Sequence, residues 1–220
     1  MKLPKAYLSY SAWSLWQKNK KQFREKYYEN KKIPTSVEMI FGKKIAVIME
    51  NEEQTLKDPL LCMIPRYSEP EFEIITKIED IPVKGFIDTF DPVYLRFGEY
   101  KTGHTSCEGL SPWTEEKVLK HTQLPFYSLL IKTMFGGVTD LCHLHWIETK
   151  MKKQTLEFDG HILNSDSKDV ELTGKIVTFP RVILEEERED IKKSIIQVAN
   201  EISEDYSEYL KTYPQPHLQP

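Results

Sequence analysis

The chain has 220 residues, of which 40% are hydrophobic and 29% charged, the balance of an ordinary soluble globular protein. No apolar run is long enough to span a bilayer and the N-terminal residues lack a signal-peptide core, so we exclude a membrane protein and expect a cytoplasmic location. The three cysteines are widely spaced and exclude a disulfide framework, while a net charge of −4 counts mildly against a nucleic-acid-binding protein.

Two helices are expected in the first quarter of the chain. Aromatic residues recur at helical spacing after Ser9 and Ser11, which predicts a helix that one of these serines caps and that ends near Asn30. A second helix is expected over about 35–56, followed by a connector with several prolines. Lysine and arginine are frequent between residues 18 and 44, where they form either a phosphate-binding patch or an ordinary solvated helix face.

Three strands and a long helix are expected in the middle of the chain. The strands are predicted over 71–78, 83–90 and 93–101, and the dipeptide Asp91-Pro92 is typical of a turn that joins the last two as a hairpin. A polar loop follows. The helix is predicted to run from a capping threonine to the glycine pair that ends it, over 114–135.

The remaining elements are three strands and a charge-rich helix, expected over 139–150, 154–162, 170–179 and 181–213. This order predicts an α/β (α+β) fold in which a mixed central sheet is flanked by helices. We expect a single domain over 1–213 and a flexible tail over 214–220.

The residues best suited to chemistry lie on the second and third strands of the middle group. Asp88 stands in an otherwise apolar strand, and Glu99 and Lys101 are two residues apart in the next, so that both point to one face. A hairpin can bring Asp88 close to Glu99, and two neighbouring carboxylates favour a divalent cation between them. Lys101 could then orient or deprotonate a water, or offset charge that develops on a phosphate. The simpler interpretation is a surface Glu–Lys pair beside a turn aspartate.

The sequence around these residues resembles a known nuclease family. The strings GFIDTFDP (85–92) and YLRFGEYKTG (94–103) are similar to the active-site hairpin of the PD-(D/E)xK nuclease superfamily, in its RecB-like and Cas4-like branch. Three other segments resemble parts of that branch, namely its S-x-S opening at 8–11, its Gly-x-x-x-His helix at 41–50 and its Gln-x-x-x-Tyr helix at 121–127. The resemblance covers about Leu8 to Ile147 and implies a restriction-endonuclease-like αβββαβ core, extended here by C-terminal strands and a helix.

The resemblance implies a role for each residue of the hairpin. Asp88 and Glu99 would hold Mg²⁺ or Mn²⁺, with the backbone carbonyl of Tyr100 as a further ligand. Lys101 would be the catalytic lysine. No iron–sulfur cluster is expected, because the cysteines that hold one in Cas4-like members have no counterparts in this sequence.

The same resemblance gives the following helix a part in the site. Gln123 and Tyr127, one helical turn apart, would line the site and position the substrate strand or the lysine. A tyrosine on an amphipathic helix is otherwise an ordinary core residue, and that interpretation stays open for Tyr127.

One metal ligand of the family is missing. The branch has a histidine four residues after the helix glycine, and Ala46 occupies that position here. Glu50, one turn further on, is the first candidate to replace it as a metal ligand, and Glu38 is the second. An exposed glutamate without any metal contact is the alternative for both.

His143 and His145 form a separate pattern. They alternate along a predicted strand, so both side chains face one side of the sheet, and a His-x-His pair can be half of a zinc site. No third ligand is evident in the sequence, and packed or hydrogen-bonded histidines are therefore the favoured interpretation.

The function that these observations favour is a metal-dependent DNA nuclease, with an exonuclease as the leading form. The family and the small size suggest recombination, repair or the processing of phage or mobile-element DNA, in the host cytoplasm if a phage encodes the protein. DNA is the expected partner, a recombination or replication protein could recruit it, and the sequence does not indicate an oligomeric state. The alternatives are a structure-specific endonuclease such as a junction resolvase, and a non-catalytic module that binds DNA or protein.

Overall fold

The computed structural model describes residues 1–32, 45, 49, 59–104, 112–158 and 161–213. The elements in chain order are β1 (Leu8–Ser9), α1 (Tyr10–Lys18), α2 (Lys20–Tyr27), α5 (Pro59–Cys62), β2 (Glu69–Ile78), β3 (Ile81–Asp91), β4 (Arg96–Gly103), α6 (Glu115–Leu119), α7 (Gln123–Phe135), β5 (Leu141–Phe158), β6 (His161–Val182) and α8 (Glu185–Thr212). None of the helices in the described ranges combines the length and the apolar character needed to cross a membrane.

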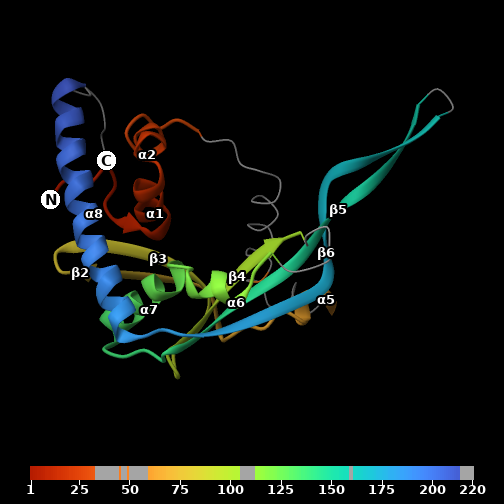
Figure 1. The fold of residues 1–220 in the computed structure, drawn as a ribbon, viewed down its shortest axis with the longest axis horizontal. Helices are drawn as coiled ribbons and strands as arrows, with labels where there is room; N and C mark the ends of the chain where they lie inside the picture. The colour runs from red at the N-terminus through yellow and green to blue at the C-terminus, as the bar shows by residue number, and fades with distance from the viewer. Residues whose placement is uncertain (33–44, 46–48, 50–58, 105–111, 159–160, 214–220) are drawn as a thin grey trace.

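A mixed six-stranded sheet forms the centre of the molecule, with α7 and α8 packed on it, and this confirms the predicted fold class (Figure 1). β3 pairs along one edge with β2 in antiparallel register. Its other edge is shared by two strands, because β1 pairs in parallel at Val83 and Lys84 and β4 pairs in antiparallel register from Thr89 to Asp91. Between Lys84 and Thr89, this edge of β3 therefore has no neighbouring strand among the described residues.

The first predicted helix is interrupted. Ser9 caps α1 as expected, since its hydroxyl accepts the backbone N–H of Ala12 at 3.3 Å. The prediction of one helix to about Asn30 is wrong, because the chain breaks at Asn19, whose side chain accepts the N–H of Gln22 and starts α2. An asparagine that caps a new helix competes with continuing the old one.

The long helix predicted over 114–135 is also divided, into α6 and α7. At the break, Nη1 of Arg181 on β6 donates to the carbonyls of Val118 and His121, both at 2.8 Å. A continuous helix would leave the His121 carbonyl unpaired, because Pro125, four residues further on, has no N–H. Pro125 lies in the first turn of α7, where a missing N–H is tolerated.

The three strands predicted after α7 are in fact two. β5 and β6 run as one long antiparallel hairpin that reaches out from the body of the molecule (Figure 1). The register shifts between Ile147 and Thr149 and again between Met151 and Lys153, so bulges replace the predicted strand ends. The helix predicted over 35–56 lies outside the described residues, except for Ile45 and Met49, which are helical, and the predicted tail lies outside them entirely.

The two ends of the described chain are joined by packing and hydrogen bonds. α1 and α2 lie beside α8 (Figure 1). The indole Nε1 of Trp16 donates to Glu201 at 2.9 Å, and Arg24 pairs with Asp205, which also accepts the Tyr28 hydroxyl at 3.0 Å. α8 thus fixes the N-terminal helices next to the open edge of β3.

Candidate active site

The carboxylate of Asp88 lies where β3 and β4 separate. Their ladder ends at the pair Thr89 and Gly98, and the next pair in register would be Asp88 opposite Glu99. There, the backbone N–H of Tyr100 donates to Oδ2 of Asp88 at 2.5 Å. The Asp88 side chain thus accepts a hydrogen bond that a backbone carbonyl would accept in a continuous ladder. This bond holds Asp88 beside β4.

Glu99 and Lys101 form a buried pair that α7 completes. Glu99 is only 2% exposed, and Nζ of Lys101 donates to its Oε1 at 2.6 Å. The same Nζ donates to Oε1 of Gln123 at 2.9 Å, and Nε2 of Gln123 donates to the Tyr127 hydroxyl at 3.1 Å. The structure therefore brings Glu99, Lys101, Gln123 and Tyr127 into one hydrogen-bonded chain. It does not bear out the simpler interpretation of an exposed surface pair.

Gly85 shows why a glycine begins this motif. A Cβ at this position would lie 2.9 Å from Cε1 of Tyr127 and 3.2 Å from side-chain atoms of Ile74 and Leu130. Real Cβ contacts are not that short, so any other residue would push α7 away from the sheet. The glycine lets Tyr127 lie against the β3 backbone.

The three ionisable side chains perturb one another. Burial raises the pKa of Asp88 well above its usual range, and the charge of Glu99 raises it further. Burial also raises the pKa of Glu99, although Lys101 opposes this shift. For Lys101, burial lowers the pKa, but the charges of Glu99 and Asp88 outweigh burial and raise it overall. The site therefore holds a protonated lysine among carboxyl groups that lack full charge compensation.

Glu71 is a further acidic residue at this site, and the sequence analysis did not identify it. The register of β2 with β3 runs from Pro70 opposite Thr89 to Phe72 opposite Ile87, and steps over Glu71 and Asp88. The backbone of Glu71 has φ of 45°, a left-handed conformation that strains a non-glycine residue, and its charge raises the pKa of Asp88. Glu71 could have been identified only by its place opposite Asp88, and that place follows only from the register of β2 with β3.

The donor set suits a hard divalent cation such as Mg²⁺ or Mn²⁺. Oε2 of Glu99 is buried without a hydrogen-bond partner, and both carboxyl groups have raised pKa values that a cation would reverse. Among the described residues, no three His, Cys, Asp or Glu side chains are grouped to hold a metal, so protein ligands beyond Asp88 and Glu99 would include backbone oxygen. The proposed ligand Glu50 lies outside the described residues.

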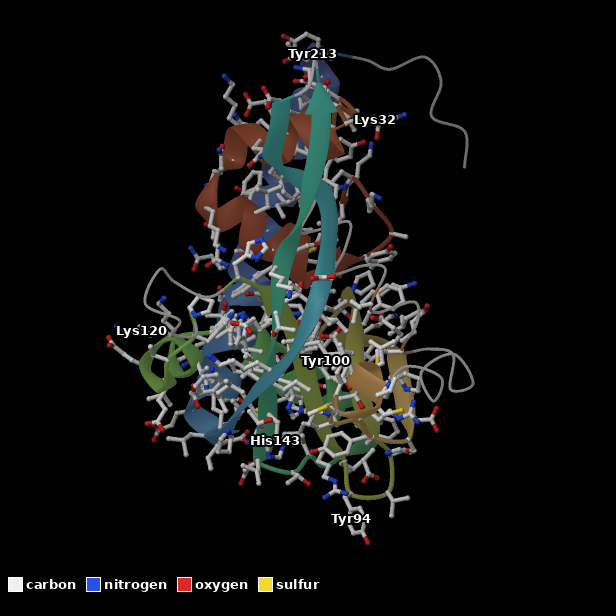
Figure 2. The ribbon with its side chains drawn as sticks, turned by 90° about the vertical axis from the view of Figure 1, so that its right-hand side faces the viewer. Lys32, Tyr94, Tyr100, Lys120, His143 and Tyr213 are labelled. Atoms are coloured by element: carbon white, nitrogen blue, oxygen red, sulfur yellow. The ribbon has the colours of Figure 1, made fainter. Side chains whose placement is uncertain are left out.

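The histidine pair lies on the other face of the sheet. His143 and His145 are in register with Gly98 and Tyr100, whose side-chain positions alternate with that of Glu99. Their rings stack at 5.8 Å (Figure 2 labels His143 and Tyr100). The Tyr67 hydroxyl lies 3.0 Å from Nδ1 of His143, and burial lowers the pKa of His145 to about 4. These are packed, hydrogen-bonded histidines, as the favoured interpretation predicted.

The fold is shared with solved structures. The chain is similar to "Putative exonuclease" from Eubacterium rectale, with a TM-score of 0.53 and 10% sequence identity over 90% of this chain and 82% of that one. It also matches SSO0001, with a TM-score of 0.44 and 15% identity over 90% and 75% of the two chains. No protein-family model and no curated protein matches the sequence. At 10% identity the Eubacterium rectale match establishes the fold alone, which is nuclease-like.

Proposed function

We propose that the protein is a divalent-metal-dependent nuclease of the PD-(D/E)xK type that hydrolyses phosphodiester bonds in DNA. One observation carries the proposal: two carboxyl groups with raised pKa values, the half-buried Asp88 and the buried Glu99, share a site with a protonated lysine, Lys101. Burial of an unbalanced acidic pair destabilises a fold, so a functional requirement for the pair is the simplest reason to keep it.

Asp88 and Glu99 would hold Mg²⁺ or Mn²⁺, together with the carbonyl of Tyr100. When bound, such a cation polarises a phosphate oxygen and lowers the pKa of a bound water. The Tyr100 N–H holds the carboxylate of Asp88 in place. Oε2 of Glu99, which has no hydrogen-bond partner among the described residues, is available for coordination.

Lys101 would stabilise negative charge that develops on the reacting phosphate. Its raised pKa keeps a proton on Nζ, which favours charge stabilisation over the role of general base. Gln123 accepts one Nζ hydrogen bond and is held in turn by Tyr127, so these two residues would position the lysine.

The third metal ligand is proposed in the segment that precedes α5. Glu50 is the first candidate and Glu38 the second, because Ala46 cannot coordinate. Glu50→Gln keeps the shape and removes the charge, and it should raise the Mg²⁺ concentration that half-maximal cleavage needs. An unchanged requirement in Glu50→Gln with an impaired Glu38→Gln would transfer the role to Glu38.

We propose an exonuclease as the form of the activity. The support is coarse: the fold is shared with a protein named as a putative exonuclease. DNA would be its partner in recombination, repair or phage and mobile-element processing, where a recombination or replication protein would recruit it.

The test uses end-labelled linear DNA and circular DNA, each incubated with Mg²⁺, Mn²⁺ or EDTA. We expect linear DNA to shorten and circular DNA to stay intact, with no reaction in EDTA. Nicking or linearisation of the circle would establish an endonuclease instead. No cleavage with either metal, by a protein that still binds DNA, would replace the nuclease with a binding module.

A further inference from the structure

A groove opens at the edge of β3 where, in the part of the chain that the structure describes, no strand pairs between Lys84 and Thr89. Its volume is about 540 Å³, within the range of ligand-binding clefts. The N-terminal segment, α2, β3 and α7 all contribute to its lining. Gln123 and Tyr127 line the groove and also belong to the hydrogen-bonded chain that reaches Lys101. Whatever occupies the groove therefore lies next to the candidate active site.

One wall of the groove combines a lysine with two aromatic rings. Nζ of Lys84 lies 5.3 Å from the ring centre of Tyr7 and 4.8 Å from that of Phe86. Phe86 is 45% exposed, and so presents much of its ring to the groove. Glu73 on β2 pairs with Lys84 at 2.9 Å and fixes the lysine between the rings.

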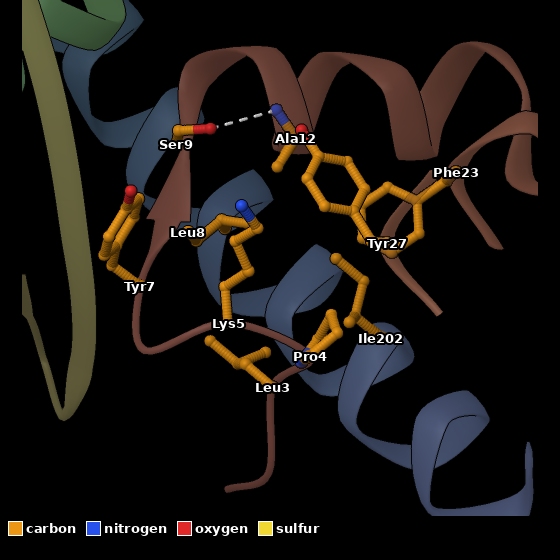
Figure 3. Close-up of a pocket in the computed structure, with 10 residues that line it drawn as sticks. All are labelled: Leu3, Pro4, Lys5, Tyr7, Leu8, Ser9, Ala12, Phe23, Tyr27 and Ile202. Atoms are coloured by element: carbon orange, nitrogen blue, oxygen red, sulfur yellow. Dashed lines mark hydrogen bonds between the residues drawn. The ribbon is translucent and has the colours of Figure 1, made fainter. Parts of the chain in front are cut away.

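The other side of the groove places two lysines around one aromatic ring. Tyr27 on α2 has Nζ of Lys26 at 5.2 Å and Nζ of Lys5 at 5.8 Å from its ring centre. Figure 3 shows the Lys5 amine between Tyr7 and Tyr27, and all three residues line a small cavity of about 20 Å³. Both lysines are exposed and both tyrosines are half-buried. Aromatic faces and ammonium groups thus stand on both sides of the opening.

The lining is positively charged although the chain is not. The described residues that line the groove include Lys5, Lys26 and Lys84 and no acidic side chain, in a chain of net charge −4. A concave surface of one sign concentrates ligands of the other sign, and phosphate groups are the anions that a nuclease meets.

We infer that this groove binds single-stranded nucleic acid and leads it to the carboxylate–lysine site. The inference rests on the proposed function and specifies its substrate class. Every unpaired base has a face that can stack on an aromatic ring, whereas a duplex keeps those faces stacked on one another and offers mainly phosphates. Lysines alone would suit either form, but the rings of Tyr7, Tyr27 and Phe86 add affinity only for unpaired bases.

The test is fluorescence anisotropy with a labelled 15-nucleotide oligo-dT, in EDTA so that no metal-dependent cleavage intervenes. A duplex of the same length and an oligo-rU are the comparison probes, the second of which separates DNA from RNA. We expect oligo-dT to bind about 10-fold or more tightly than the duplex, because stacking adds about 1–3 kcal/mol per base.

Two variants separate stacking from charge. Phe86→Ala should weaken oligo-dT binding about 5-fold or more without changing its salt dependence. Lys26→Ala should reduce the slope of log affinity against log salt by about 0.7, the value for one phosphate on a single strand. Matched controls lie away from the groove: Tyr94→Ala, at the far end of the molecule (Figure 2), and Lys120→Ala, whose side chain is 74% exposed, should leave both quantities unchanged.

Each outcome decides the inference. Equal affinity in Phe86→Ala and Tyr94→Ala, with both variants folded by circular dichroism, would overturn it. So would tighter binding of the duplex than of either single strand. Specific binding of oligo-dT without cleavage in Mg²⁺ or Mn²⁺ would leave the groove intact and overturn the nuclease. Cleavage of DNA by the wild type, with oligo-dT binding unchanged in Phe86→Ala and Lys26→Ala, would support the nuclease and overturn the inference about the groove.

Discussion

Two buried charged clusters in this molecule differ in how completely their charges are matched. Arg188 on α8 is 3% exposed, and each of its guanidinium nitrogens has a partner. Nε donates to Ser128 at 2.8 Å, Nη1 to Glu185 at 2.9 Å, and Nη2 to Asp140 at 2.5 Å and to the Ile183 carbonyl at 3.0 Å. In the cluster of Asp88, Glu99 and Lys101, Glu99 is 2% exposed and the other two are half-buried, yet Oε2 of Glu99 has no partner among the described residues.

This difference distinguishes a buried charge that stabilises the fold from buried charges that serve a function. A buried cation whose three nitrogens are all hydrogen-bonded anchors α8 to α7 and to the residue before β5. Two neighbouring carboxyl groups, one of them fully buried, with one lysine leave a deficit of positive charge, which a bound cation would correct. Substitutions in both clusters test this distinction.

The largest effect should come from Lys101→Ala. We expect the rate of DNA cleavage to fall by about 10³-fold, because the lysine acts on charge present mainly in the transition state. Binding of DNA, measured in EDTA, should change little. The measurement is single-turnover cleavage, with circular dichroism to establish folding and Lys120→Ala as the control. A folded variant that cleaves at the wild-type rate would show that Lys101 is a structural partner.

Arg188→Met should have the largest effect on stability. It leaves the buried hydroxyl of Ser128 and the carbonyl of Ile183 without their donor, whereas Asp140 and Glu185 are exposed and stay solvated. The loss costs about 1–3 kcal/mol and lowers Tm by about 5 °C. Thermal unfolding measures this, and cleavage per folded molecule should not change. The control is Lys192→Met, which breaks the exposed ion pair to Glu79 and should cost less than about 1 kcal/mol. Similar losses in both variants would contradict the assignment of Arg188 as an anchor.

Asp88→Asn should stabilise the metal-free protein, by about 1–2 kcal/mol at neutral pH. The folded-state pKa of Asp88 is raised, so its stability contribution falls as pH rises from the unfolded value of about 4 through that raised pKa. The Asp88→Asn variant has no carboxyl group at this position, so it does not lose stability in this way as the pH rises. Its advantage in Tm should therefore vanish near pH 4 and grow toward neutrality.

Added Mg²⁺ provides the internal control for that substitution. It should raise the Tm of the wild type and have a smaller effect on Asp88→Asn, since only the wild type keeps both carboxylates. A variant less stable than the wild type in EDTA at pH 7 would mean that the aspartate charge is already compensated within the fold.

The smallest effect is expected from Tyr127→Phe. The change removes one hydroxyl that accepts from Gln123 and leaves the packing against Gly85 intact. The cleavage rate should fall about 2- to 10-fold, the equivalent of one hydrogen bond. An undiminished rate would return Tyr127 to an ordinary core role, which was the alternative left open by the sequence.

The sequence predicted the fold class and the neighbourhood of Asp88, Glu99 and Lys101, because both depend on local rules. Alternation in a strand fixes which residues share a face, and a turn sets which strands meet. Glu71 escaped because Glu69, Glu71 and Glu73 look alike in sequence, and only the register with β3 shows which of them lies opposite Asp88.

Long-range contacts account for the other errors. At the break between α6 and α7, Pro125 is a local signal, but the cation that binds the free carbonyls is Arg181, which lies some 60 residues away and looks in sequence like one more surface cation. Arg188 reads in the same way, in a charge-rich helix whose inner face is known only once α7 is placed. The β5–β6 hairpin exceeded its predicted length because pairing between the two strands carries each across positions that resemble turns.

The link between the N-terminal helices and α8 has a consequence for synthesis of the chain. Arg24 on α2 and its partner Asp205 on α8 are 181 residues apart, so α2 cannot be fixed to α8 until the end of the chain has been made. At about 5–20 residues per second, the interval is about 10–40 s. During that time a nascent chain can form the hairpin of Asp88 and Glu99, but Lys26 and Tyr27 are not yet held across the groove from Phe86. Ribosome-bound chains that stop before α8 should therefore lack the single-strand binding surface, and that surface should appear late and in one step.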